Sequence, residues 1–179
     1  SQMLKDAAST YTPAVEYPAS SFGSGLSLLA EAIIGDLGMR VGHITLGGFD
    51  THNTQGEDHQ ALMETLDSGL TAFQQDLAAH GKADDVLVLT WSEFWRRVEE
   101  NGNKGTDHGA ASVMFALGNG VQKGMYGDAP DLSALVDNGN VPYTTDFRRV
   151  YATVMDRWLG VPHEALLGQK WEQLGFLGA

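Results

Sequence analysis

The chain has 179 residues and 42% of them are hydrophobic, so it is long enough and apolar enough to fold around a core. Its formal net charge of −12 disfavours binding to nucleic acid or anionic lipid, but permits an anionic substrate where a metal reverses the local field. The absence of cysteine excludes disulfides and thiolate metal sites, and no apolar run reaches the roughly 20 residues of a membrane span.

The N-terminal segment, residues 1–21, is polar and irregular, and we expect a lead-in or linker there. Its start does not have the pattern of a signal peptide. Apolar residues from Leu26 to Leu37 then recur at helical spacing, which predicts a helix. Ser24 is the expected N-cap of this helix and Gly38 its expected end.

The next three elements predict a strand, a helix and a second strand. Residues 41–46 are short and mostly apolar and are bounded by two glycines, which is typical of a buried strand. Residues 57–80 form the clearest helix, and residues 86–90 are a continuous apolar run that suits a central parallel strand. This order is a βαβ unit, so the predicted fold is α/β with a mostly parallel sheet flanked by helices.

The second half of the chain is predicted to be richer in loops. Residues 91–109 are polar and loop-like, residues 112–117 suggest a third strand, and residues 124–144 are expected to wrap the surface. A helix capped by Thr145 and ended by Gly160 should follow.

Candidate functional residues gather at the predicted strand ends. Asp50 and His52 follow the first strand, Glu93 follows the second, and His108 precedes the third. Function in open α/β sheets collects at the carboxyl ends of parallel strands. Carboxylate oxygens and imidazole nitrogens suit Zn²⁺, Mn²⁺ or a related divalent ion, so these four residues are the candidate metal ligands.

Each candidate also has a purely structural interpretation. Asp50 can cap a turn, and His52 can hydrogen-bond the backbone of its loop. Glu93 can instead pair with Arg96 or Arg97. Among the other histidines, His59 on the apolar helix face suits a core position or support of a ligand carboxylate. No function is assigned to His43 inside a strand, or to His80 and His163, which look like surface or cap residues.

Three basic residues stand out in this acidic chain. Arg96, Arg97 and Lys104 flank the Glu93 loop and can bind phosphate or sulfate, although surface pairing with Glu99 and Glu100 explains them equally well. The glycine-rich stretches lack the context of a nucleotide-binding loop. There is no Gly-x-Ser-x-Gly elbow, which argues against an α/β-hydrolase.

Several motifs in order resemble one bacterial family, the domain of unknown function 1501. They run over almost the whole chain: residues 47–52, 92–94 with 96–97, 100–102, 105–109, and 146–148 with 150–153. The family is similar to secreted proteins of the alkaline-phosphatase/sulfatase-like superfamily. The resemblance implies an α/β/α sandwich whose strand ends hold one or two divalent metals. The candidate ions are zinc, manganese and calcium.

The resemblance also implies roles for individual residues. Asp50, His52 and His108 match one metal-ligand set, and Glu93 stands where the superfamily usually has an Asp-His pair. Asp50 and His52 are closer in sequence than the common spacing. Trp95 replaces a usual glycine, where an aromatic side chain can reshape the mouth of a pocket.

The implied activity is metal-dependent hydrolysis of a small phosphate or sulfate ester in the periplasm or outside the cell. Glu93 is then a ligand or general base, and Arg96 stabilises the anionic transition state. The superfamily's nucleophile comes from an N-terminal half, so residues 22–179 are expected to be the C-terminal portion of such a domain, and the fold to be incomplete. Pairing with that half, or self-association, would cover the exposed strand edge. The alternative is a non-catalytic secreted binding or structural protein.

Overall fold

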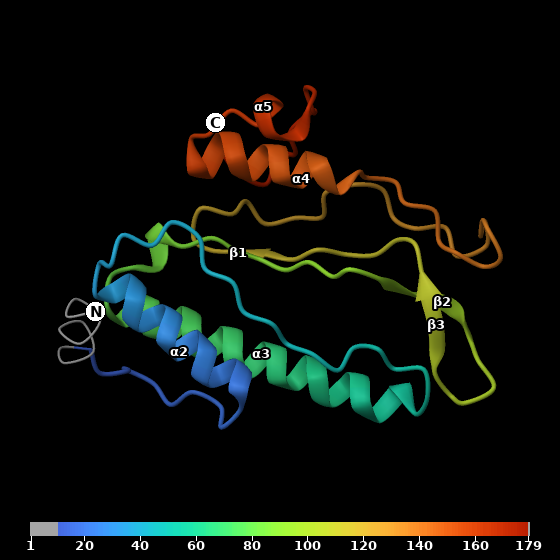
Figure 1. Cartoon of the computed structure of the whole chain (residues 1–179), viewed down its shortest axis with the longest axis horizontal. Helices are drawn as coiled ribbons and strands as arrows, with labels where there is room; N and C mark the ends of the chain where they lie inside the picture. The colour runs from blue at the N-terminus through green and yellow to red at the C-terminus, as the bar shows by residue number, and fades with distance from the viewer. Residues whose placement is uncertain (1–10, 179) are drawn as a thin grey trace. The chain divides into compact units, whose positions relative to one another are not determined.

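A computed structural model describes residues 11–178 of the chain (Figure 1). The chain divides into two compact units, one that ends at Val86 and one that begins at Leu87. In the residues that the structure describes, the first unit contains two α-helices and a short 3₁₀ turn, and the second contains the β-strands. Within the described residues, no helix combines the length and the apolar character needed to cross a membrane.

Helices α2 (Ser21–Ile34) and α3 (Gln55–Ala79) form the first unit. Both were predicted, and both are confirmed as helices. The predicted cap of α2 is wrong, because Ser20 and not Ser24 accepts the hydrogen bond from the Gly23 N–H, at 3.0 Å. The helix also ends at Ile34, before the predicted stop.

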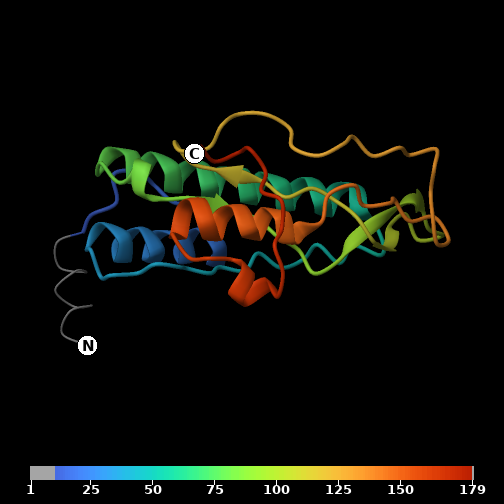
Figure 2. The same cartoon turned by 90° about the horizontal axis from the view of Figure 1, so that it is seen from above.

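Helix α2 packs closely against α3, and the two helices run in the same direction (Figures 1 and 2). Gly69 makes the close approach possible: a Cβ there would lie 2.8 Å from Cε1 of Phe22. The apolar core of this unit is small. Its buried hydrophobic members are Phe22, Leu26, Ala30, Ala72, Phe73 and Leu77.

The segment between the helices is extended but is not a strand. Residues 41–46 were predicted to be a buried strand, and this prediction is wrong. The segment instead packs its side chains against α2, where Ile44 lies beside Gly25 and where a Cβ on Gly42 would be 2.8 Å from Leu29. Val41 is 73% exposed. This apolar segment packs against a helix instead of pairing with a strand.

A fully buried carboxylate ties the lead-in segment to α3. Asp76 accepts hydrogen bonds from the Tyr11 hydroxyl at 2.5 Å, the Tyr17 hydroxyl at 2.8 Å and the Ala14 N–H at 2.8 Å. The His80 imidazole lies 3.3 Å from the same carboxylate. Residues 11–20 contain neither helix nor strand, as predicted, and these bonds hold them in place.

The cluster shifts the pKa values of its members. Burial alone would raise the pKa of Asp76, but the hydrogen bonds from Tyr11, Ala14 and Tyr17 and the nearby His80 hold it below its ordinary value. Burial and the Asp76 contact raise the pKa of Tyr11 to about 12, and they raise that of Tyr17 further. The folded state therefore favours an ionised aspartate between neutral phenols.

The second unit contains two antiparallel strand pairs. Strand β1 (Val88–Leu89) pairs with β4 (Ala116–Leu117), and β2 (Trp95–Glu100) pairs with β3 (Thr106–Gly109). The predicted strands at 86–90 and 112–117 are thus partly confirmed. The prediction of a loop over 91–109 is wrong, because most of that segment is a β-hairpin. Two-stranded pairs are too little sheet to test the expected α/β/α sandwich, which stays a prediction.

The C-terminal helix is confirmed, with a different cap. Helix α4 (Phe147–Val154) begins after Asp146, whose carboxylate accepts from the Arg148 N–H at 2.9 Å, so the predicted cap Thr145 is wrong. A π-helical turn (Met155–Leu159) continues it and ends at Gly160, as predicted, with φ of 66°. The short helix α5 (Glu164–Leu167) follows.

A second polar cluster fastens the last residues to this helix. The Asp156 carboxylate lies 2.8 Å from Nδ1 of His163 and accepts from the His163 N–H at 3.0 Å. Burial would raise the pKa of Asp156, but its hydrogen bonds with His163 and Gln173 hold it below its usual range. The buried Thr153 hydroxyl accepts from the Leu174 N–H at 2.7 Å.

Replacing Asp76 by Asn should destabilise the protein by about 3 kcal/mol, because an amide cannot satisfy three donors as an ionised carboxylate does. Urea unfolding measures the loss. Asp67→Asn, the same change at an exposed position of α3, is the matched control and should lie within about 0.5 kcal/mol of wild type. Equal stability of the two variants would contradict the role of Asp76.

The contribution of Asp76 should also depend on pH. Its folded-state pKa is lower than the unfolded value of about 3.9, so its stabilisation is present above that pH and is lost as pH falls through the folded pKa. The stability difference between wild type and Asp76→Asn should therefore shrink below about pH 4. A difference that stays constant from pH 7 to pH 2 would contradict this.

Candidate functional site

Asp50 and His52 project from one side of a short loop segment. Thr51 between them is 4% exposed, while the Asp50 and His52 side chains are 57% and 45% exposed. The Thr51 N–H donates to the Phe49 carbonyl at 2.9 Å, and the His52 N–H donates to the Asp50 carbonyl at 3.2 Å. With Thr51 turned inward, the two functional side chains both face outward.

The loop is held against the start of α3. The Phe49 ring contacts the His59 ring edge-on, with centroids 5.8 Å apart. Gly48 has a φ of 103°, and a Cβ there would lie 3.1 Å from Cδ2 of Leu62. His59 is half-buried, so its position agrees with the packing interpretation of that residue. The contacts fix the loop beside the helix without using Asp50 or His52.

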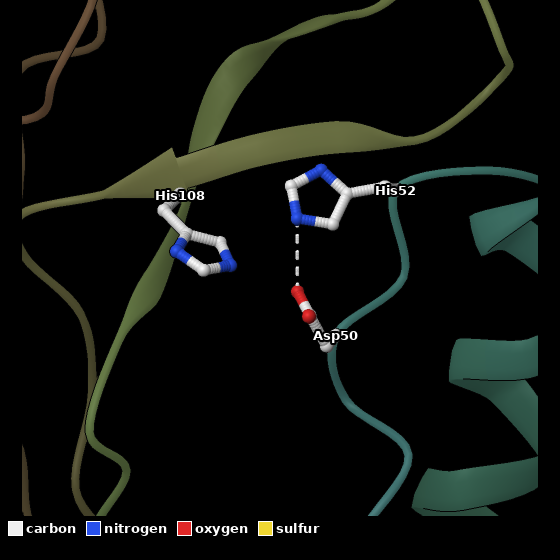
Figure 3. Close-up of side chains that lie close together, drawn as sticks. All are labelled: Asp50, His52 and His108. Atoms are coloured by element: carbon white, nitrogen blue, oxygen red, sulfur yellow. Dashed lines mark ion pairs between the residues drawn. The ribbon is translucent and has the colours of Figure 1, made fainter.

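The carboxylate and imidazole of this pair face each other. Oδ1 of Asp50 lies 3.0 Å from Nε2 of His52 (Figure 3). Two ligands on one tetrahedral ion, with bonds of about 2.0–2.1 Å, lie about 3.3 Å apart, and those at right angles lie about 2.9 Å apart. The observed separation fits neighbouring ligands of a divalent ion. It is equally the length of an Asp–His hydrogen bond.

His108 belongs to the second unit, on strand β3, and is exposed. It is the direct cross-strand partner of Arg96, so the two side chains share a face of the hairpin. Phe94, two residues before Arg96, stacks its ring on that of His108 with centroids 4.1 Å apart and an interplanar angle of 8°. Figure 3 also draws the His108 side chain and its strand.

The two arginines of the hairpin bind its backbone. Arg96 donates from Nη1 to the Thr106 carbonyl at 2.9 Å, and its guanidinium lies 5.1 Å from the Phe94 ring centroid. Arg97 donates from Nε to the His108 carbonyl at 3.2 Å. Glu93 is exposed and immediately precedes Phe94. The hairpin thus brings Arg96 and His108 side by side, with Glu93 at its base.

The three histidines without a predicted function take different positions. His43 is exposed in irregular chain rather than in a strand. His80 ends α3, with Nδ1 2.9 Å from the Asp76 carbonyl. His163 is 4% exposed and is the N-cap residue of α5, so of its two predicted positions, surface or cap, the structure confirms the cap. Its Nε2 accepts from the Trp171 N–H at 2.9 Å, which leaves Nδ1 to donate to Asp156.

Sequence reasoning missed the aromatic support of His108. Phe94 was read as part of a loop motif and received no role. The signal was present, because apolar and basic residues from Phe94 to Val98 precede an Asn-Gly-Asn-Lys-Gly turn and a second short polar run. A hairpin across that turn places Phe94 near His108. The turn itself is built by Asn101, whose Oδ1 accepts from the N–H groups of Asn103 and Gly105.

The chain matches the family model described as "Protein of unknown function (DUF1501)" over residues 1–170. It therefore belongs to this family. Comparison with curated proteins gave no match, and comparison with solved structures gave none either.

Replacing Gly109 by Ala should disrupt the strand that carries His108. A Cβ at Gly109 would lie 2.6 Å from the Arg96 carbonyl oxygen, which is main chain and cannot move aside cheaply. We expect a loss of about 1–3 kcal/mol and faster amide exchange across β2 and β3. Gly102→Ala, in the turn of the same hairpin with no atom near its Cβ, is the matched control. Identical exchange in both variants would contradict the expectation.

Proposed function

We propose that Asp50, His52 and His108 bind a divalent metal ion. Each side chain offers one ligand atom, so the three would supply an ion with one carboxylate and two imidazoles. The observation that carries the proposal is the 3.0 Å separation between the Asp50 carboxylate and the His52 imidazole. Both side chains are exposed, on a loop that Phe49 holds against α3. Binding one ion requires ligands from both units, and zinc, manganese or calcium are the candidate ions.

The chemistry of this donor set suits catalysis better than a structural role. Structural zinc sites in proteins are closed by four protein ligands, whereas catalytic sites have three and leave a position for water or substrate. A set of one carboxylate and two imidazoles matches the second pattern. The exposure of Asp50 and His52 allows a substrate to reach such a position.

We propose the reaction to be hydrolysis of a phosphate or sulfate ester, in an alkaline-phosphatase-like α/β/α sandwich outside the cytoplasm. A bound divalent cation supplies Lewis-acid polarisation of the ester oxygen. Arg96, on the same hairpin face as His108, would donate hydrogen bonds to an anionic oxygen. Glu93, at the base of the hairpin, would act as a further ligand or as the general base that takes a proton from water.

One observation favours the non-catalytic alternative. The Arg96 guanidinium already donates to the Thr106 carbonyl and lies against Phe94, so part of its hydrogen-bonding capacity serves the hairpin. A guanidinium has five N–H donors, so a bond to one carbonyl does not by itself prevent Arg96 from binding an anion. Whether the chain turns over an ester or only holds an ion is decided by the activity test below.

Protein purified without chelator should contain about one divalent ion per chain by elemental analysis. Asp50→Ala, His52→Ala and His108→Ala should each weaken binding by more than the tenfold to hundredfold typical of groups that only orient a ligand. His43→Ala, an exposed histidine outside the set, is the control. Absence of metal, with no change of the melting temperature on adding chelator, would contradict the proposed centre.

The full-length gene product should hydrolyse at least one of a panel of aryl phosphates, phosphodiesters and aryl sulfates when supplied with Zn²⁺ or Mn²⁺. Asp50→Ala or His108→Ala should abolish turnover, and Arg96→Lys should lower kcat by about 10²-fold or more, since an ammonium cannot reproduce the guanidinium fork. Metal binding without turnover of any ester would instead establish the non-catalytic alternative.

A further inference from the structure

The aromatic contact beneath His108 suggests how the hairpin prepares this residue. We infer that Phe94 is a positioning residue that orients the His108 imidazole for metal binding, an inference that rests on the proposed metal centre. The two rings lie nearly parallel, 8° apart, with centroids 4.1 Å from each other. The rings are therefore stacked face to face at close range.

Stacking suits a metal ligand because of where imidazole carries the lone pair that binds a metal. In a neutral imidazole the lone pair of the unprotonated nitrogen lies in the plane of the ring, at its edge, so a partner on the ring face does not cover it. Phe94 therefore restricts the His108 ring without competing for its nitrogens. Most supporting groups of metal-bound histidines act differently, by accepting a hydrogen bond from the second nitrogen.

Phe94 is itself held by the hairpin. Its carbonyl accepts from the Ser92 hydroxyl at 2.8 Å, and the Arg96 guanidinium lies 5.1 Å from its ring centroid. Arg96 is in turn fixed by its bond to the Thr106 carbonyl. The main chain on the other side is fixed as well, because Arg97 donates to the carbonyl of His108.

These contacts predict an imidazole that is ordered before metal arrives. A side chain that is already in its binding orientation loses less conformational freedom on binding, so affinity rises without any new contact to the ion. Removing the aromatic ring at position 94 should leave His108 able to bind but no longer oriented. The substitution should then weaken metal binding, and the hairpin should remain folded.

The test compares Phe94→Leu with Phe94→Tyr, which keeps a stacking ring, and with Phe115→Leu. Phe115 is a half-exposed phenylalanine elsewhere in the same unit, which makes it the matched control for loss of an aromatic ring. Zn²⁺ affinity is measured by calorimetric titration of the whole chain. We expect Phe94→Leu to weaken binding by about tenfold, and Phe94→Tyr and Phe115→Leu to stay within about twofold of wild type.

A second readout follows His108 without metal. Stacking places its ring protons in the ring current of Phe94, so their NMR signals in the metal-free protein should move toward random-coil values in Phe94→Leu and stay in place in Phe115→Leu. The His108 signal is assigned with His108→Ala. Unchanged signals in Phe94→Leu would overturn the inference, because they would show that the His108 ring does not stack on Phe94 in the metal-free protein.

The outcomes separate this inference from the proposed function. Wild-type protein that binds Zn²⁺, with Phe94→Leu binding equally well, overturns the positioning role and leaves the metal centre intact. Wild-type protein that binds no Zn²⁺ overturns the metal centre and the positioning role with it. Weaker binding in Phe94→Leu, restored by Phe94→Tyr, supports both.

Discussion

A carboxylate that is wholly or partly removed from water must be matched by hydrogen-bond donors, and in each unit one such aspartate organises the packing. Asp76 is fully buried and receives donors from a segment that precedes the helices. Asp156 holds the buried His163, whose other nitrogen fixes the main chain at Trp171. Chain without regular secondary structure is held to a helix in both cases by charge-assisted bonds, which are stronger than neutral ones.

This arrangement explains how a small apolar core supports the exposed loops of the candidate site. Buried polar clusters are directional, so they define the path of irregular chain in a way that apolar contact alone does not. The hydrogen bonds of Asp76 fasten α3 to the segment before α2. The loop that carries Asp50 packs on the first turns of α3 through Phe49 and His59. The loop is thus held through Phe49 and His59, while the Asp50 and His52 side chains of the candidate site remain exposed.

Local patterns in the sequence were enough to predict the helices but not the sheet. The apolar period of α3 is decided by residues close in sequence, and Phe73 and Leu77 are buried as that period requires. Residues 41–46 have the composition of a strand, but a strand forms only by pairing with a neighbouring strand. This segment packs against α2 instead. The hairpin was missed because its strands are polar and so lack the composition typical of a strand. Its pairing depends on the turn at Asn101. Of the candidate site, the sequence indicated the ligand types and the Asp50–His52 pair. It did not indicate the Phe94 stack, which depends on the register of β2 against β3.

The charge of the chain constrains what such a site can do. A net charge of −12 repels an anionic ester at long range, so an anion binds only where local positive charge outweighs that field. The hairpin contributes Arg96 and Arg97, but both donate to backbone carbonyls, and Asp50 adds a negative charge to the candidate ligand set. One carboxylate and two neutral imidazoles around a divalent cation leave a net charge of about +1, which reverses the local sign. The proposed ester chemistry therefore depends on the metal for binding the substrate as well as for activating it, so loss of the metal centre would remove the basis of the ester proposal too.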